Sequence, residues 1–368
     1  MYYLFKYKKV LYNYIGDNMI GFALEGGGAK GAYQAGAYIA LRKNGIKPSI
    51  IAGTSIGSVN AALMAQGDVN KLVNIWLDTT TDIFGINSEI IDKIKSKRFS
   101  KSDIKPTFTN IKEIIKNKGI DTTLFLNTLK TCIDEKKLRK SDIKFGLITV
   151  KMHGKPTPLE LTIDDIPEGK VAEYIMASCY LPIFKLKPII DNNYYIDGGF
   201  YNNVPLSLLE KQGCDTIYSI RIKGIGFNRN KLKGSTKVIE IAPRKNLGSI
   251  ILFNKESNER NMLLGYYDAL KVIKNLDGLD YYFKNRKDKY YDRIVRRVNS
   301  NTLESLKKKY HTTSNKKLVI KIIEKIFKEN NISPFKIYSA KYAIRYIKKN
   351  IVLTDRTLKK FIDSCKLI

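Results

Sequence analysis

The sequence predicts an α/β protein with a mostly parallel central sheet, followed by a helical and basic C-terminal region. Three observations support this prediction. Short apolar stretches alternate with helical patterns up to about residue 222, which is the order of parallel strands joined by crossover helices. Beyond about residue 250, helical patterns alone remain. Residues 301–368 then hold 17 Lys and Arg residues against 5 Asp and Glu residues.

The elements of the predicted sheet region follow one another closely. A short apolar strand is expected at 20–24, and a glycine-rich loop separates it from a helix over 32–44. A second strand is expected at 48–52, and a sharp turn leads from it into a helix of small residues. The remaining core elements are helices at 58–66, 169–178 and 205–212, and strands at 145–152, 157–163, 194–196 and 216–222.

Four stretches of different character divide the chain. Residues 1–18 form an N-terminal extension, 19–222 the α/β domain, and 223–368 the mainly helical basic region. Within the domain, 67–140 is polar and helical, which indicates an insertion or a lid. The C-terminal region carries an apolar helical stripe that we expect to pack on the α/β domain rather than on a membrane or partner: Val319, Ile322, Ile323, Ile326 and Phe327.

The start of the chain allows two interpretations. Met19 stands directly before the first predicted strand, so the natural start is either Met1 or Met19. If the chain starts at Met19, residues 1–18 are upstream sequence that was wrongly assigned to the protein. If it starts at Met1, they are a basic and aromatic arm that could touch a membrane.

Composition excludes several classes of protein. Apolar residues make up 43% of the 368 residues, enough for a large core, so disorder is not expected for most of the chain. With only 25 Gly and 10 Pro residues, collagen-like and low-complexity structure is excluded. No run approaches the roughly 20 apolar residues that span a bilayer. The four cysteines are scattered without a CxxC pair, and no secretory signal is visible, so a cytoplasmic location with peripheral membrane contact is expected. A net charge of +30 suits nucleic acid, a membrane surface or an acidic substrate, or is ordinary solvated surface.

The turn Gly53-Thr54-Ser55-Ile56-Gly57 fits the pattern GxSxG. In this pattern a nucleophilic serine sits on a tight turn between a strand and a helix, and the flanking glycines relieve crowding. Here an apolar strand precedes the turn and a helix of small residues follows it. The turn therefore predicts Ser55 as a nucleophile, with a simple helix cap as the alternative.

A glycine-rich loop, Gly26-Gly27-Gly28-Ala29-Lys30-Gly31, follows the first predicted strand. Its GxGxxG spacing is typical of dinucleotide binding, which also needs an acidic residue at the end of the next strand. That strand ends instead in Ile51-Ala52-Gly53-Thr54. The other interpretation is an oxyanion hole of free backbone amides, with positive charge from Lys30 beside it.

Asp197, in Asp197-Gly198-Gly199, is the candidate base, and by itself this tripeptide is an ordinary turn. A triad with histidine would need His153 or His311, and neither has a recognisable catalytic setting. The order Ser55, Asp197, His311 still matches the α/β-hydrolase order, so a His311 triad stays open. We favour a Ser55–Asp197 dyad, because a buried carboxylate can take the serine proton directly.

These motifs in this order resemble the patatin-like phospholipase family. Ala177-Ser178-Cys179-Tyr180-Leu181-Pro182 lies between them, Asn203-Val204-Pro205 follows them, and the resemblance covers roughly residues 20–222. It implies a three-layer α/β/α fold and a Ser–Asp lipid acyl hydrolase that works through an acyl-enzyme. The sequence departs mildly from the family pattern at Glu25 and Gly199.

The resemblance also assigns the site residues. Ser55 would be the nucleophile and Asp197 the base, and the oxyanion hole would consist of Gly26, Gly27, Gly28 and the amide of Ile56. Supporting roles fall to Lys30, Gly31, Gly53, Gly57, Gly198 and Gly199. No cofactor and no metal is implied, because the sequence has no His/Cys cluster and no acidic calcium loop.

Two other functions remain open at this stage. One is a soluble carboxylesterase or thioesterase that uses the same site, and the other is a non-enzymatic protein that binds anionic membranes through its charge. The expected partners are a phospholipid or other acyl-ester lipid and an anionic membrane surface. Nucleic acid is not expected, because no RNP-type strand, zinc-finger spacing or basic zipper is present. The sequence does not predict an oligomeric state.

Overall fold

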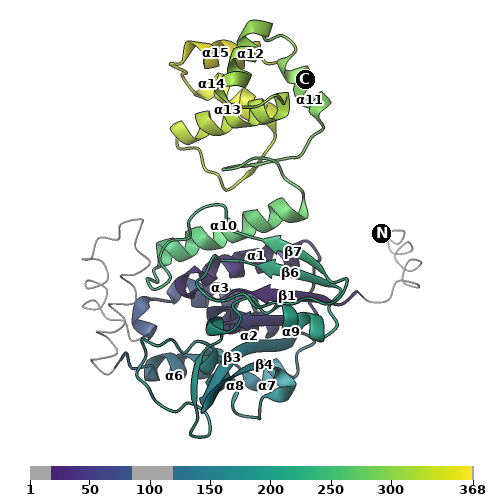
Figure 1. Cartoon of the computed structure of the whole chain (residues 1–368). Coiled ribbons are helices and arrows are strands. Elements are labelled where there is room, and N and C mark those ends of the chain that lie inside the picture. The colour runs from purple at the N-terminus through teal and green to yellow at the C-terminus, as the bar shows by residue number, and fades with distance from the viewer. Residues whose placement is uncertain (1–17, 85–118, 367–368) are drawn as a thin grey trace, which may run out of the picture. The chain divides into compact units, whose positions relative to one another are not determined.

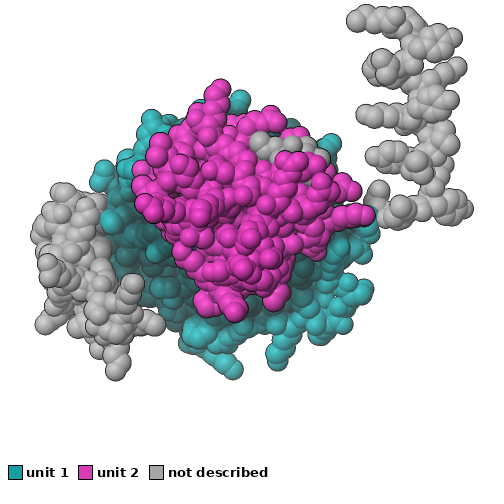
Figure 2. All heavy atoms as spheres, turned by 90° about the horizontal axis from the view of Figure 1, so that it is seen from above, with its two compact units in different colours: residues 1–265 teal, residues 266–368 magenta. Residues whose placement is uncertain are grey.

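The computed structural model describes residues 18–84 and 119–366. It divides into two compact units, residues 1–265 and 266–368, which are coloured separately in Figure 2. Nearly all of the predicted N-terminal extension, and the middle of the predicted insertion at 67–140, lie outside the described residues.

Unit 1 is built on a mixed sheet that is mostly parallel (Figure 1). The strand order is β4-β3-β2-β1-β6-β7, and β5 pairs with β3. The run from β3 to β7 is parallel, whereas β4 and β5 lie antiparallel to β3. In the described part of unit 1 the strands are β1 Ile20–Leu24, β2 Ile50–Thr54, β3 Lys144–His153, β4 Lys155–Thr162, β5 Tyr194–Asp197, β6 Thr216–Ile220 and β7 Lys237–Ile241.

Helices cover both faces of this sheet, because successive residues of a strand point to opposite sides. On one face, Phe22 of β1 meets Tyr38 of α1 edge to face, with ring centroids 6.3 Å apart. On the other face, Ala23 of β1 shares a buried cluster with Leu208 and Leu209 of α9. The predicted three-layer α/β/α arrangement is therefore confirmed. Outside residues 1–17 and 85–118, the helices of unit 1 are α1 Ala32–Lys43, α2 Ile56–Ala65, α3 Val69–Asp78, α6 Thr123–Cys132, α7 Glu135–Arg139, α8 Val171–Ser178, α9 Leu206–Lys211 and the first half of α10 Lys255–Ile273.

Unit 1 extends further along the chain than the predicted boundary at residue 222. Strand β7 continues the parallel sheet beyond β6, with Thr216 in register with Lys237. Gly265 in α10 lies so close to α1 that a Cβ there would be 1.9 Å from the carbonyl oxygen of Tyr33. Pairing and close helix contact therefore hold residues 223–265 to the sheet domain.

Unit 2 is a small helical bundle with a two-strand parallel pair. The apolar stripe expected to pack on the α/β domain is instead buried in this unit's own core, with Val319, Ile322 and Ile326 fully covered. The elements are α11 Asp288–Val295, α12 Ser300–Lys309, α13 Asn315–Glu329, α14 Ala340–Asn350 and α15 Arg356–Ser364, with β8 Tyr282–Phe283 and β9 Ile337–Tyr338. Across the described residues of both units, no helix combines the length and apolar character needed to cross a bilayer.

Candidate active site

Ser55 lies at the carboxyl end of β2, immediately before the first turn of α2. Its backbone has φ 54° and ψ −130°, which a residue with a side chain rarely adopts. The glycines on either side make the turn possible. A Cβ at Gly53 would be 2.0 Å from the carbonyl oxygen of Gly57, and one at Gly57 would be 2.4 Å from that of Leu24. The GxSxG pattern therefore reflects backbone packing as well as the serine itself.

Ser178, at the end of α8, fixes the backbone of the Ser55 turn. Its hydroxyl accepts a hydrogen bond from the Ser55 amide at 3.0 Å and donates one to the carbonyl of Ile148 at 2.7 Å. The Ser58 hydroxyl donates to the Ser55 carbonyl at 2.6 Å. The Ser55 amide is thus hydrogen-bonded to α8 and its carbonyl to α2, and these two contacts stabilise the strained turn.

Asp197 ends β5, which β3 holds in register by pairing Thr149 with Asp197. Only 3% of its surface is exposed. One oxygen, Oδ1, accepts a hydrogen bond from the Gly199 amide at 2.7 Å, while Oδ2 has no hydrogen-bond partner among the described residues. A buried carboxyl oxygen without a partner is costly unless it has a role, so this atom is a candidate for chemistry.

Burial raises the pKa of Asp197 to about 6, and the Ser55 hydroxyl and then the Gly199 amide oppose this rise. The serine and the carboxyl are thus close enough to interact, although no hydrogen bond of ordinary geometry joins them in this conformation. Catalytic hydrogen bonds are often long without substrate. The thiol of Cys179 is buried beside both groups, and burial followed by the Asp197 charge raises its pKa well above the ordinary value.

Asn203 and two glycines connect the serine, the aspartate and the glycine-rich loop. A Cβ at Gly26 would be 2.4 Å from Asn203 Oδ1 and 3.0 Å from the Cβ of Ser55. A Cβ at Gly199 would be 2.9 Å from Asn203 Oδ1 and 3.0 Å from Asp197 Oδ1. The three sequence motifs therefore meet at one place, with no room for side chains at either glycine.

The glycine-rich loop presents two amides without an acceptor. Among the described residues, the amides of Gly27 and Gly28, like that of Ile56 at the start of α2, donate no hydrogen bond. Gly28 has φ +56°, and a Cβ there would be 1.9 Å from the carbonyl oxygen of Ile250. The Gly26 amide, by contrast, donates to the carbonyl of Asn203 at 3.1 Å. Gly26 is therefore a poor candidate for the oxyanion hole, because its donor is already used.

Glu25 anchors this loop, and sequence analysis gave it no role. It is buried, and its carboxylate accepts hydrogen bonds from the amides of Ile222 at 2.5 Å and Lys223 at 2.9 Å. It also pairs with Arg221 at 2.9 Å. The side chain of Lys30 donates to the carbonyl of Lys223 at 2.9 Å. Burial lowers the pKa of Lys30, and the nearby Glu25 charge opposes that shift.

A second buried polar network lies behind Gly31. A Cβ at Gly31 would be 2.7 Å from the indole ring of Trp76. The Asn60 side chain donates to the Gly31 carbonyl at 3.0 Å and accepts from the Trp76 indole at 2.8 Å. Gln34 joins the same network through its oxygen, 2.8 Å from Asn60 Nδ2. Gly31 thus supports the loop by packing rather than by offering a donor.

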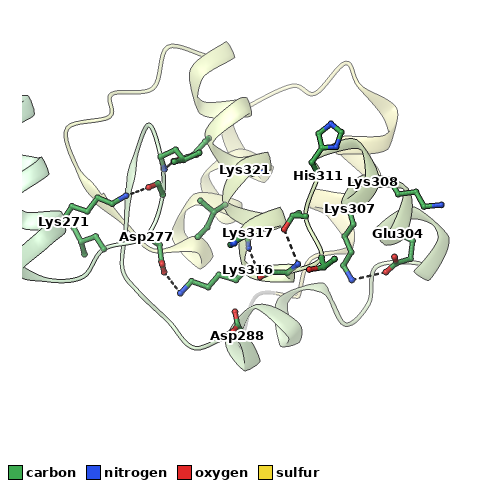
Figure 3. A pocket seen from close by; sticks show the side chains of 18 residues that line it. Lys271, Asp277, Asp288, Glu304, Lys307, Lys308, His311, Lys316, Lys317 and Lys321 are labelled. Carbon is green, nitrogen blue, oxygen red and sulfur yellow. Dashed lines mark hydrogen bonds and ion pairs between the residues drawn. The ribbon is translucent and has the colours of Figure 1, made fainter. Parts of the chain in front are cut away.

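His153 is remote from this arrangement, and His311 belongs to the other compact unit. His153 is exposed at the end of β3, four residues past the partner of Asp197 in the sheet, or about 13 Å along the strand. His311 belongs to unit 2, where it lines an open cavity of about 1390 Å³ (Figure 3). Several lysines of that cavity already have partners, including Lys307 with Glu304 and Lys316 with Asp277.

A family model for the patatin-like phospholipase domain matches residues 22–209, slightly more than half of the chain. Lysophospholipase NTE1 of Kluyveromyces lactis is 27% identical over 211 residues, which are 56% of this chain and 13% of that protein. Lysophospholipase NTE1 of Saccharomyces cerevisiae is 26% identical over 281 residues, 71% of this chain and 14% of that protein. VipD from Legionella pneumophila superposes with a TM-score of 0.42 and 14% identity over 95% of this chain and 83% of that one.

The fold and the matched motifs define a member of a family of carboxylic ester hydrolases. The chain belongs to the patatin-like phospholipase family, and the resemblance expected from its motifs is confirmed. It spans only a small part of the length of the curated relatives given above. In the part of the chain that is described, no group of three or more His, Cys, Asp or Glu side chains is placed to hold a metal ion.

Proposed function

We propose that this protein is a lipid acyl hydrolase, of phospholipase A type, that cleaves fatty-acyl esters with Ser55 as nucleophile and Asp197 as base. The observation that carries the proposal is the pairing of a serine on a strained turn with a buried carboxyl, one oxygen of which has no hydrogen-bond partner within residues 18–84 and 119–366. Family membership supports a lipid ester as the substrate class.

In the first step, Ser55 Oγ attacks the carbonyl carbon of the ester as its proton passes to Asp197. A pKa of about 6 suits this role, because the carboxylate is ionised at neutral pH and still more basic than an ordinary aspartate. The tetrahedral intermediate then collapses. The alcohol leaves with the proton held by Asp197, and the acyl group stays on Ser55 as an ester.

The oxyanion of that intermediate would be held by the amides of Gly27, Gly28 and Ile56. Each well-placed donor of this kind contributes about 3 kcal/mol to the stabilisation of the transition state. Ile56 opens a helix of ten residues, so its amide adds the positive end of the helix dipole. In the second step, water attacks the acyl-enzyme, Asp197 takes its proton, and Ser55 regains that proton as the fatty acid leaves.

The test is a panel of phospholipids, lysophospholipids and short monomeric esters, with fatty-acid release as the readout. Ser55→Ala is expected to remove activity, and Asp197→Asn to reduce it nearly as far. For the wild type on an uncharged ester, kcat/KM should fall about tenfold per pH unit below about pH 6, because protonated Asp197 cannot act as base.

Three results would overturn parts of the proposal. Full activity in Ser55→Ala would refute the nucleophile. Loss of activity in His311→Ala together with its retention in Asp197→Asn would refute the Ser55–Asp197 dyad. Hydrolysis confined to soluble esters would favour the carboxylesterase or thioesterase alternative over a lipid hydrolase.

A further inference from the structure

Residues 223–233 form an exposed loop that combines apolar and basic side chains. Ile225 is 77% exposed and Phe227 is 55% exposed, although both are large and apolar. The chain holds no acidic residue between 222 and 237, and the exposed basic residues of this loop are Lys223, Arg229, Lys231 and Lys233. Exposed apolar side chains among cations, with no acidic residue in the segment itself, form a surface suited to a partner that is both apolar and anionic. The Glu210 carboxylate of α9 binds the backbone amides of Lys233 and Gly234 at the end of the loop.

The 223–233 loop touches both halves of the candidate active site. At its start, a Cβ on Gly224 would be 1.7 Å from the carbonyl oxygen of Gly26, which opens the glycine-rich loop. Further along, the amide of Phe227 donates to the carbonyl of Gly199 at 2.8 Å, two residues after Asp197. The loop therefore follows the carboxyl end of β6, at the same edge of the sheet as Ser55.

The backbone of this loop is fixed, so its exposed side chains are not those of a loose tail. The Glu25 carboxylate holds the amides of Ile222 and Lys223 at the start of the loop. The Asn230 side chain donates to the carbonyl of Val204 at 2.8 Å. The guanidinium of Arg229 lies 5.3 Å from the centre of the Phe227 ring. Ile225 and Phe227 are thus presented on a rigid base.

We propose that the 223–233 loop is the surface by which the catalytic unit docks on an anionic phospholipid membrane. Ile225 and Phe227 enter the region between head groups and acyl chains, while Lys231 and Lys233 contact lipid phosphates. The proposal rests on the proposed function, because it supplies the contact that brings aggregated lipid to Ser55. Charge complementarity and contact with the glycine-rich loop select a lipid surface over an acidic protein.

The experiment compares the full chain with the double variant Ile225→Ser/Phe227→Ser. Fatty-acid release is measured on phosphatidylcholine vesicles with and without phosphatidylserine, and on monomeric p-nitrophenyl butyrate. The ratio of vesicle activity to monomer activity is expected to fall at least about tenfold, because each buried apolar side chain contributes strongly to insertion. Vesicle co-sedimentation should fall in parallel.

Two control variants distinguish membrane insertion of Ile225 and Phe227 from the effect of removing any exposed apolar or charged side chain. Val352→Ser removes an apolar side chain that is 93% exposed in unit 2, and should leave the activity ratio unchanged. Lys231→Gln/Lys233→Gln should weaken binding only to vesicles with phosphatidylserine, by about fivefold for each lysine, and added salt should abolish that difference.

The outcomes distinguish this inference from the proposed function. If the wild type hydrolyses lipid but Ile225→Ser/Phe227→Ser keeps the same ratio, the docking surface is refuted and the proposed function stands. If the wild type hydrolyses neither substrate, the proposed function fails, and co-sedimentation alone decides the docking surface. If the double variant unfolds at a lower temperature than the wild type and binds vesicles equally well, the two side chains are covered by another part of this chain.

Discussion

Replacing Asp197 by Asn should make unit 1 more stable while it removes activity. Burial raises the pKa of this carboxyl from its ordinary value of 3.8 to about 6, so folding disfavours its charge. The difference between these two values corresponds to about 3 kcal/mol of lost stability at neutral pH. The asparagine oxygen can still accept from the Gly199 amide, and its buried NH₂ group costs about 1 kcal/mol, which leaves a net gain of about 2 kcal/mol.

The sign of the pH dependence follows from the raised pKa. The penalty is fully present above about pH 6 and shrinks as the pH falls; it disappears below 3.8, where the carboxyl is protonated in both the folded and the unfolded chain. The stability gain of Asp197→Asn should therefore be largest at pH 7.5 and small near pH 4.

Scanning calorimetry at pH 7.5 and at pH 4.5 would measure this, followed on the transition of unit 1. The expected rise in melting temperature at pH 7.5 is about 4–8 °C for a unit of this size. Ser55→Ala is the matched control, because it also removes activity but leaves the carboxylate buried. Should Asp197→Asn melt below the wild type at pH 7.5, or keep the same advantage at pH 4.5, the account of Asp197 as a strained base is wrong.

Two further predictions concern the glycine-rich loop and its anchor. Gly28→Ala should lower kcat on a soluble ester at least about a hundredfold, because its Cβ would collide with the Ile250 carbonyl and displace an oxyanion donor. The control is Gly234→Ala, whose Cβ would meet only ordinary contacts and which should leave kcat unchanged. Equal effects of the two variants would refute the assignment of Gly28 to the oxyanion hole. Glu25→Gln should reduce the free energy of unfolding, measured in urea, by about 2–3 kcal/mol, because it breaks a buried carboxylate network. Glu240→Gln, on the exposed side of the same Arg221, should change it by less than about 1 kcal/mol. Similar losses in the two variants would contradict the role of Glu25 as a buried anchor.

The parts of the fold that could be predicted are those that patterns of neighbouring residues indicate. The apolar strand, glycine loop and helix at the start of unit 1 occupy neighbouring residues, so their order predicts a parallel crossover. Strand β7 was missed because Lys237 and Glu240 make it polar, as its exposed edge position allows. The antiparallel directions of β4 and β5 depend on pairing with β3, which no local pattern encodes.

The candidate site residues could be proposed from the sequence, whereas the residues that support them in the structure could not. Ser55 and Asp197 stand in short motifs with glycines beside them, so each could be found within a few residues. Arg221 reaches Glu25 across 196 residues of sequence, and Ser178 reaches the Ser55 amide across 123. Long-range contacts of this kind leave no spacing signal. The net charge of +30 likewise did not identify a partner. A basic loop such as 223–233 is recognised by where the charges lie on the surface, and the sum of the charges does not show this.

The pairing of β1 with β6 has a consequence for synthesis of the chain. Ile20 of β1 lies in register with Thr216 of β6, so the middle of the sheet cannot close until nearly 200 more residues have been made. At 5–20 residues per second, that delay is about 10–40 s. Throughout this interval one edge of an apolar strand lacks its neighbour on the nascent chain. The growing polypeptide therefore depends, more than a protein of local contacts, on being shielded from aggregation until β6 emerges.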